Sequence, residues 1–213
     1  MRIRPDERHH LARYLHVLML GEHVAARCAK AQARMVTAPR VRRFFNAQAR
    51  QEKMHAAIFQ HAVQWLAPKG IPSQDAVALM YRYDALIDEA IQRQDLAETV
   101  LATQVMLESL GEVCLDRLDA GVANRGFGLR RLRQIVLNQE RAHHDFGRRQ
   151  LDSYIALDDT IRGRLQTRAA DYGMLIDQII MAFQGAFECF DEEMAAFQYE
   201  VRQGFPAWMV SPQ

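Results

Sequence analysis

The stretch from Leu137 to Phe146 reads Leu-Asn-Gln-Glu-Arg-Ala-His-His-Asp-Phe and contains Glu140 and His143, three residues apart. On an α-helix, residues three apart lie on the same face, so this carboxylate and this imidazole can point at one position. An earlier stretch repeats the order Gln-Glu-x-x-His with Glu52 and His55. Two such pairs in one chain predict a metal centre between helices.

Each pair is preceded by a further glutamate on the apolar face of an expected helix. Glu22 lies 30 residues before Glu52, and Glu108 lies 32 residues before Glu140. Two antiparallel helices joined by a short loop bring residues with this separation to the same level. The chain therefore predicts two helical hairpins in tandem, each of which supplies one Glu and one Glu-x-x-His pair.

The charge of these side chains favours bound cations. Burying an unpaired carboxylate costs several kcal/mol even after relaxation, whereas two divalent cations would neutralise four carboxylates. Carboxylate oxygen and imidazole nitrogen suit iron or manganese. The three cysteines, Cys28, Cys114 and Cys189, form no C-x-x-C pair, which excludes a thiolate site built from local cysteine spacing.

Hydrophobic residues recur with helical spacing along most of the chain, and strand-like alternation is nearly absent. This pattern predicts an all-α fold. We expect four long helices, a crossover helical segment between the second and third, and additional C-terminal helices. Thr37 is a candidate N-cap, and Asp95 with Glu98 resembles a capping box. A break in the C-terminal part is expected near Gly173 or Gly185. The expected ranges are 5 to about 35, 39 to about 66, 73 to about 94 (the crossover), 95 to about 121, 129 to about 154, and 160 to about 202, with a loop over 121–128 and an irregular tail from 204.

Length and composition fit one soluble domain over residues 1–213. We expect the metal-binding bundle over about 8–155 and a C-terminal helical extension over about 158–203. No apolar run is long enough to serve as a signal peptide or to span a membrane. The sparse, odd set of cysteines is typical of a reducing compartment, so we expect a cytoplasmic protein.

The first 50 residues hold eleven Arg or Lys and three acids, whereas residues 169–201 hold acids and no Arg or Lys. This distribution fits solvated helix faces that complement one another. It also fits a basic N-terminal surface that binds an anionic partner.

The two Glu-plus-Glu-x-x-His half-sites resemble those of the ferritin-like di-iron carboxylate superfamily, over about residues 8–155. The resemblance implies two iron ions, with Glu52 and either Glu108 or Glu140 as bridging ligands. Glu-Ser-Leu at 108–110 and Glu-Arg-Ala-His-His-Asp-Phe-Gly at 140–147 are also similar to the corresponding helices of aldehyde-deformylating oxygenases. The ligand positions implied by the resemblance are Glu22, Glu52, His55, Glu108, Glu140 and His143.

Departures from relatives of this superfamily narrow the expected function. Storage ferritins lack the second histidine, which is His143 here. Rubrerythrins carry a four-cysteine iron domain, which this chain lacks. Radical-generating ribonucleotide reductase subunits have a tyrosine where this chain has Phe59. Manganese catalases share the six-ligand pattern, so manganese is an alternative metal.

The resemblance thus implies a di-iron oxidase or oxygenase that activates O₂ to oxidise an organic substrate, either a hydrophobic acyl or aldehyde chain or a modified tRNA base. A di-manganese catalase-like protein or a ferroxidase is the alternative. Electrons would come from a separate ferredoxin or reductase, because the chain has no flavin, nicotinamide or four-cysteine motif. The oligomeric state is open.

The roles of several residues near the six expected ligands are less closely defined by the sequence. Glu112 lies one turn from Glu108 and could replace it as a ligand. Gln51 and Gln139 each precede a ligand glutamate, and we expect each amide to hydrogen-bond the histidine of the opposite pair. His144 is expected at the surface or beside the ligands.

Overall fold

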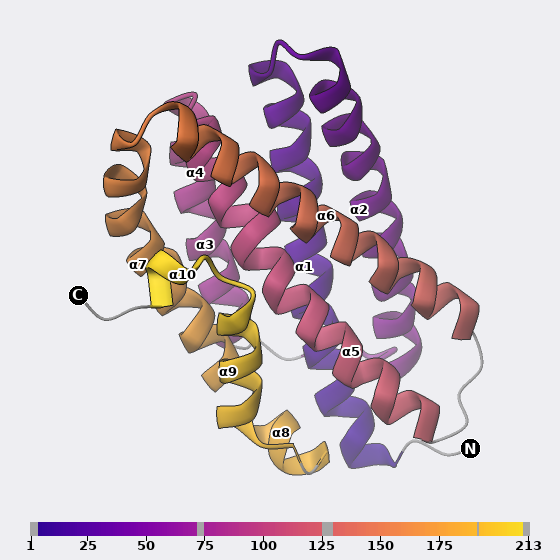
Figure 1. Ribbon diagram of the computed structural model, residues 1–213. Helices are drawn as coiled ribbons and strands as arrows, with labels where there is room; N and C mark the ends of the chain where they lie inside the picture. The colour runs from indigo at the N-terminus through magenta and orange to yellow at the C-terminus, as the bar shows by residue number, and fades with distance from the viewer. Residues whose placement is uncertain (1–3, 72–74, 125–129, 191, 211–213) are drawn as a thin grey trace.

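The computed structural model describes residues 4–71, 75–124, 130–190 and 192–210, and every regular element in these ranges is helical (Figure 1). The all-α prediction is therefore confirmed. The elements are α1 (Pro5–Met35), α2 (Pro39–Leu66), α3 (Asp75–Gln92), α4 (Leu96–Val100), the π-helix η1 (Leu101–Leu107), α5 (Glu108–Asn124), α6 (Arg130–Leu157), α7 (Thr160–Met181), α8 (Gln184–Phe190), α9 (Met194–Gln203) and α10 (Ala207–Val210).

Local sequence signals account for several helix ends. Pro39 is the first residue of α2, where its fixed φ suits a helix and its missing N–H would have had no partner. The N-cap is Ala38, so the prediction of Thr37 as the cap is wrong. Asp95 does cap α4, because its carboxylate accepts a hydrogen bond of 3.0 Å from the Glu98 N–H. The loop predicted over 121–128 begins later, since α5 continues to Asn124, and residues 125–129 lie outside the described ranges.

The expected third helix is not a single α-helix. Seven residues from Leu101 to Leu107 form a π-helix, and at its end the Glu108 N–H donates to the carbonyl of Thr103, five residues earlier. π-Helical turns are rare in proteins, and those that occur are often found at functional sites. Here it ends at the predicted ligand Glu108, so it sets the direction in which that side chain leaves the backbone.

A close contact with α6 accompanies the π-turn. Gly147 lies so near Gln104 that a Cβ atom on Gly147 would stand 2.3 Å from the Cβ of Gln104 and 3.0 Å from its carbonyl carbon. Only glycine permits this approach. The backbone of α6 therefore lies directly against η1, one turn beyond His143.

The long helices form two antiparallel pairs (Figure 1). α1 and α2 are joined by a short turn at residues 36–38, and the run α4–η1–α5 lies against α6. α3 connects the pairs and packs on α1 and α7. Tyr83 of α3 is fully buried and donates a hydrogen bond of 2.7 Å to the carbonyl of Ala102 in η1, and its ring contacts Tyr172 of α7. The crossover segment thus supports the π-helix from outside.

The C-terminal helices reach both pairs: α7 packs on α4, η1 and α6, and α9 packs on α5, whereas α8 packs on α1. α7 passes through Gly173 without a break, and the chain turns at residues 182–183, just before Gly185. The tail predicted to be irregular from 204 contains the short helix α10, and this part of the prediction is wrong because Trp208 and Met209 pack on the core.

One contact fastens this C-terminal part to the predicted metal-binding helices, and we call it the C-terminal contact. Ser109 donates a hydrogen bond of 2.7 Å to the carbonyl of Val201, and His144 Nε2 lies 3.0 Å from the carbonyl of Gly204. A Cβ atom on Gly204 would stand 2.0 Å from Ser109 Oγ and 3.1 Å from His144. The chain reaches these side chains because residue 204 is glycine.

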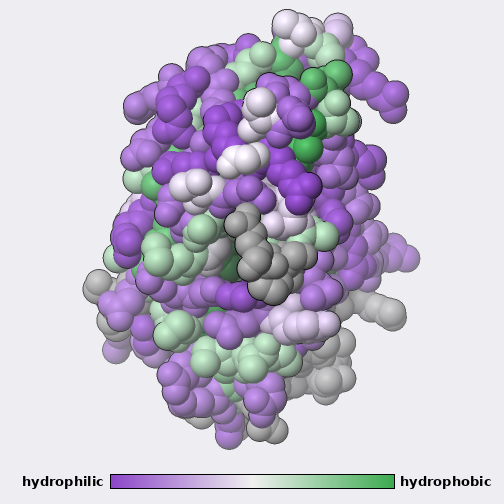
Figure 2. Space-filling view, turned by 60° about the vertical axis from the view of Figure 1, so that its left-hand side comes forward, coloured by the Kyte–Doolittle hydropathy of each residue, from purple (hydrophilic) through white to green (hydrophobic). Residues whose placement is uncertain are grey.

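The face over α7 and α10 is mixed in polarity, with purple hydrophilic residues between small green hydrophobic groups (Figure 2). Among the described helices, none combines the length and the apolar character that a membrane crossing requires.

We predict that Gly147→Ala destabilises the protein by about 1–3 kcal/mol, because the added methyl group overlaps the Cβ of Gln104 in η1 and crowds its carbonyl group. Gly163→Ala in α7 is the matched control, since a Cβ there meets nothing within 4 Å, and it should be neutral or slightly stabilising. Thermal unfolding followed by circular dichroism checks both. Equal melting temperatures for the two variants would contradict the close contact.

Candidate metal centre

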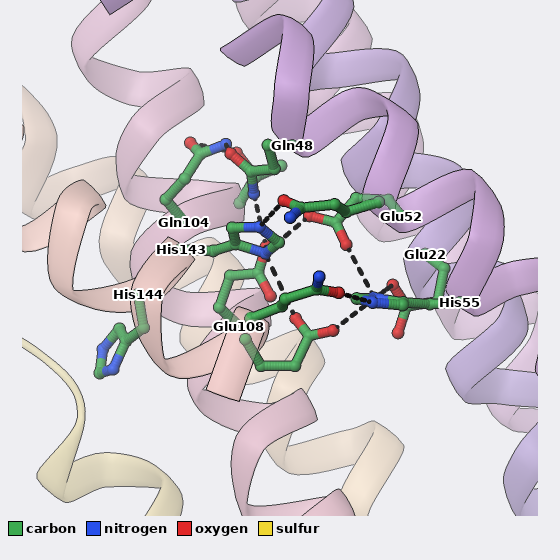
Figure 3. Close-up of polar contacts among 12 residues, drawn as sticks. Glu22, Gln48, Glu52, His55, Gln104, Glu108, His143 and His144 are labelled. Carbon is green, nitrogen blue, oxygen red and sulfur yellow. Dashed lines mark hydrogen bonds and ion pairs between the residues drawn. The ribbon is translucent and has the colours of Figure 1, made fainter. Parts of the chain in front are cut away.

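Six predicted ligand side chains meet in the interior between the two helix pairs (Figure 3). α1 supplies Glu22, α2 and α6 each supply a Glu-x-x-His pair, and α5 supplies its first residue, Glu108. The ligand atoms form two groups, each with all atoms within 4.8 Å of one another: Glu22, Glu52, His55 and Glu140 in the first, and Glu52, Glu108, Glu140 and His143 in the second.

The first group surrounds Nδ1 of His55. This nitrogen lies 2.7 Å from Glu140 Oε1, 3.1 Å from Glu52 Oε2 and 3.5 Å from Glu22 Oε2. His55 and Glu52 are completely buried, and Glu140 is almost so.

The second group surrounds Nδ1 of His143, which lies 3.0 Å from Glu52 Oε1, 3.6 Å from Glu140 Oε2 and 3.9 Å from Glu108 Oε1. Glu52 and Glu140 thus face one histidine with one oxygen and the other histidine with the second oxygen. Glu22 and Glu108 each belong to one group. Glu52 and Glu140 are thus common to both groups.

Several of these atoms have no hydrogen-bond partner. Within the described part of the chain, both oxygens of Glu52, Oε1 of Glu140 and Nδ1 of both histidines are buried without one. The ion-pair distances are short, but the contacts of these atoms lack hydrogen-bond geometry, and the atoms of each group lie within 4.8 Å of one another. Leaving such groups buried without partners costs about 1–3 kcal/mol each, and a cation at each point would satisfy them.

The hydrogen bonds expected from Gln51 and Gln139 are present. Nε2 of His55 lies 2.8 Å from Oε1 of Gln139, and Nε2 of His143 lies 2.9 Å from Oε1 of Gln51. Each imidazole donates its Nε2 proton to an amide oxygen of the opposite motif. This contact fixes the ring and leaves Nδ1 as the nitrogen available to a metal.

Of the two glutamates between which the sequence left the ligand open, Glu108 lies in the cluster of donor atoms and Glu112 does not. Glu108 is buried inside the second group, whereas Glu112 points outward and contacts Arg141 at 3.1 Å and His144 at 3.4 Å. His144 is itself buried in the C-terminal contact.

The electrostatics show how the metal-free centre balances its charge. Burial lowers the pKa of His143, but its contacts with Glu140 and Glu52 outweigh this effect and raise the pKa to about 9. The pKa of His55 is raised for the same reasons. Burial and the nearby charge of Glu140 raise the pKa values of Glu22 and Glu108. The raised pKa values favour protonated imidazoles and protonated Glu22 and Glu108 in the absence of metal.

Sequence reasoning missed three buried glutamines, Gln32, Gln48 and Gln104, that join Glu108 in a hydrogen-bonded chain. A signal was present for two of them. Gln48 lies four residues before Glu52 and Gln104 four residues before Glu108, so each shares an inward helix face with a ligand.

Apolar surroundings separate the centre from water. Phe44 stacks on Phe146 at 3.6 Å between ring centroids and contacts the His143 ring edge to face. On another side, a cavity of about 30 Å³ touches Glu22, Glu108 and Glu140. A larger groove of about 660 Å³, between α7 and the C-terminal segment on the side of the molecule seen in Figure 2, includes none of the six ligand residues.

No protein-family model matches the chain, and no curated protein shows significant similarity to it.

We predict that Glu140→Ala abolishes the binding of two metal ions per chain, because both groups lose a shared carboxylate. The loss in affinity should exceed about 100-fold, since even outer partners of ligands contribute 10–100-fold. Glu112→Ala is the control and should keep two ions. Metal analysis after gel filtration measures both, and two ions retained by Glu140→Ala would refute the ligand assignment.

We also predict that metal binding releases at least two protons per chain near pH 7. Both histidine pKa values are raised, so the rings are protonated without metal and must lose a proton to ligate through Nδ1. Affinity should therefore rise with pH, by about a hundredfold per pH unit for two protons. Calorimetry in buffers of different ionisation enthalpy counts the protons, and a pH-independent affinity would contradict this charge balance.

Proposed function

We propose that the protein is a di-iron oxidase or oxygenase of the ferritin-like carboxylate superfamily, which uses O₂ to oxidise an organic substrate. The observation that carries the proposal is the set of buried donor atoms without partners, arranged around two points with two glutamates in common. The two antiparallel helix pairs and the connecting α3 support a ferritin-like four-helix bundle within one domain over residues 1–213.

Each of the six side chains has a defined part in this proposal. Glu52 and Glu140 would hold both ions, and each remaining carboxylate and imidazole would complete one of them. Two iron ions in these positions would supply reversible one-electron chemistry for the reduction of O₂. Gln51 and Gln139 keep the imidazoles oriented, and Phe44 and Phe146 exclude water from the His143 side.

The cavity beside the carboxylates supports O₂ as a reactant. Its volume of about 30 Å³ exceeds the 10–15 Å³ that one water-sized probe requires, so it accommodates a diatomic molecule. Its walls include Val17, Leu18, Leu107 and Phe183, and apolar walls suit an apolar gas. Gly21 of α1 and Gly111 of α5 also line it.

The size of this cavity also favours a second candidate, a di-manganese catalase-like or ferroxidase-type protein. Peroxide fits the same volume, whereas an acyl chain or a tRNA base does not fit without further opening.

In the oxygenase proposal, electrons come from an external ferredoxin or reductase. An anionic partner at the basic N-terminal stretch and a cytoplasmic location belong to the same proposal.

Aerobic titration of the metal-free protein with Fe(II), followed by absorbance, O₂ consumption and metal analysis, tests the proposal. We expect oxidation to stop at two Fe(II) per chain and to resume only when an external reductant is added. Accumulation of many irons per chain would contradict the oxygenase and indicate storage. Tight binding of Mn(II) with rapid O₂ release from peroxide would establish the second candidate.

A further inference from the structure

Glu108 is held by a chain of buried amides. Gln48 Nε2 donates a hydrogen bond of 2.8 Å to Glu108 Oε1, and Gln104 Nε2 donates one of 3.1 Å to Gln48 Oε1 (Figure 3). The three residues come from α2, η1 and α5. The chain therefore joins the first helix pair to the ligand supplied by the second.

The far end of this chain is anchored. Gln104 Oε1 accepts hydrogen bonds of 2.8 Å from both Gln32 Nε2 and Thr103 Oγ, and Gln104 Nε2 also donates to Gln32 Oε1 at 2.9 Å. All three glutamines are at most 1% exposed. Each amide has hydrogen-bond partners at both of its ends, so the network restrains the Gln48 side chain against Glu108.

Within the described ranges, no such chain of amides reaches Glu22 in the other half of the centre. His55 and His143 are each supported by one glutamine, so the imidazoles are equivalent in this respect. Glu22 differs from Glu108: among the described residues, its only recorded polar contact is the 3.5 Å approach to His55. The two carboxylates that each serve one ion are thus fixed to different degrees before any metal arrives.

Fixing a ligand in advance favours binding, since the rotamer freedom of a free glutamate must otherwise be lost when the ion binds. The amide is neutral at every pH at which the protein is folded, so its hold on Glu108 adds no charge to the centre.

We propose that Gln48 is a positioning residue that aims Glu108 at the His143 group, so that this half of the centre takes the first of two divalent ions and the Glu22 half takes the second. The inference rests on the metal centre proposed above. It adds an order of loading and names the residue that sets it.

Titration of the full-length, metal-free protein with Co(II), followed by calorimetry and visible absorbance, tests the order. The native chain should bind two ions in two resolved steps. Glu22→Gln should keep the tighter step and lose the weaker one, whereas Glu108→Gln should lose the tighter step.

Gln48→Met removes the hydrogen bond to Glu108 while keeping an unbranched side chain of similar size. We expect it to weaken the tighter step by about tenfold, the lower end of the effect of outer partners on metal affinity, and to change the weaker step by less than about twofold. Gln60→Met, on the exposed face of the same helix, is the matched control and should change neither step. Gln104→Met leaves the Gln48–Glu108 bond in place and should weaken the tighter step to a smaller extent.

Circular dichroism of each metal-free variant shows whether it folds. If Gln48→Met does not fold, the effect of Gln104→Met on the tighter step tests the role of the amide chain. Equal weakening of both steps, or an unchanged first step in a folded Gln48→Met, would overturn the proposal. Loss of the tighter step in Glu22→Gln in place of Glu108→Gln would do the same. If the native chain bound no Co(II) stoichiometrically, the metal centre itself would fail, which is a different result from two ions binding in the wrong order.

Discussion

The burial of four carboxylates and two imidazoles at one level of the fold is the constraint on which the rest of the structure depends. Each charge removed from water costs several kcal/mol, and this cost has to be offset by attraction between the buried groups or by cations that the cluster could hold. Glu52 and Glu140 lie at the middle of the cluster, because each faces both histidines. A helical arrangement suits this task, since all six side chains come from helical runs whose backbone groups are already paired.

Some of the contacts that support the six side chains occur in both halves of the centre, and others occur in one half. Gln51 and Gln139 make reciprocal contacts across the centre, because each hydrogen-bonds the histidine of the other motif. These two hydrogen bonds connect the helix pairs at the cluster of charged side chains. The amide chain through Gln48 occurs on one side alone among the described residues. Tandem sequence similarity therefore produces an approximate symmetry in the ligands, and an asymmetry in what holds them.

The Glu and His cluster and the glutamine contacts to its histidines could be predicted from the sequence. The Glu-x-x-His pairs are local, and helix geometry alone places their members on one face. The reciprocal glutamine contacts followed from the position of each amide beside a ligand. The π-turn could not be predicted, because it accompanies the approach of Gly147 to Gln104, 43 positions apart in the chain. The bond between Gln48 and Glu108 joins residues 60 positions apart and exists only once the helix pairs meet. Periodicity reports which face is buried, but not which buried polar groups will find each other.

The C-terminal contact has a consequence for the order in which the chain can fold during synthesis. Ser109 and His144 directly follow two ligand residues, yet their partners, Val201 and Gly204, are made 92 and 60 residues later. Contacts of such long range form late, after local hairpins. α1 and α2 are complete in the chain before α6 is made, although the Glu22 group still needs Glu140 of α6. The second pair gains its contacts with the carbonyls of Val201 and Gly204 only after α9 has been added, so the surroundings of the centre are completed by the last part of the chain.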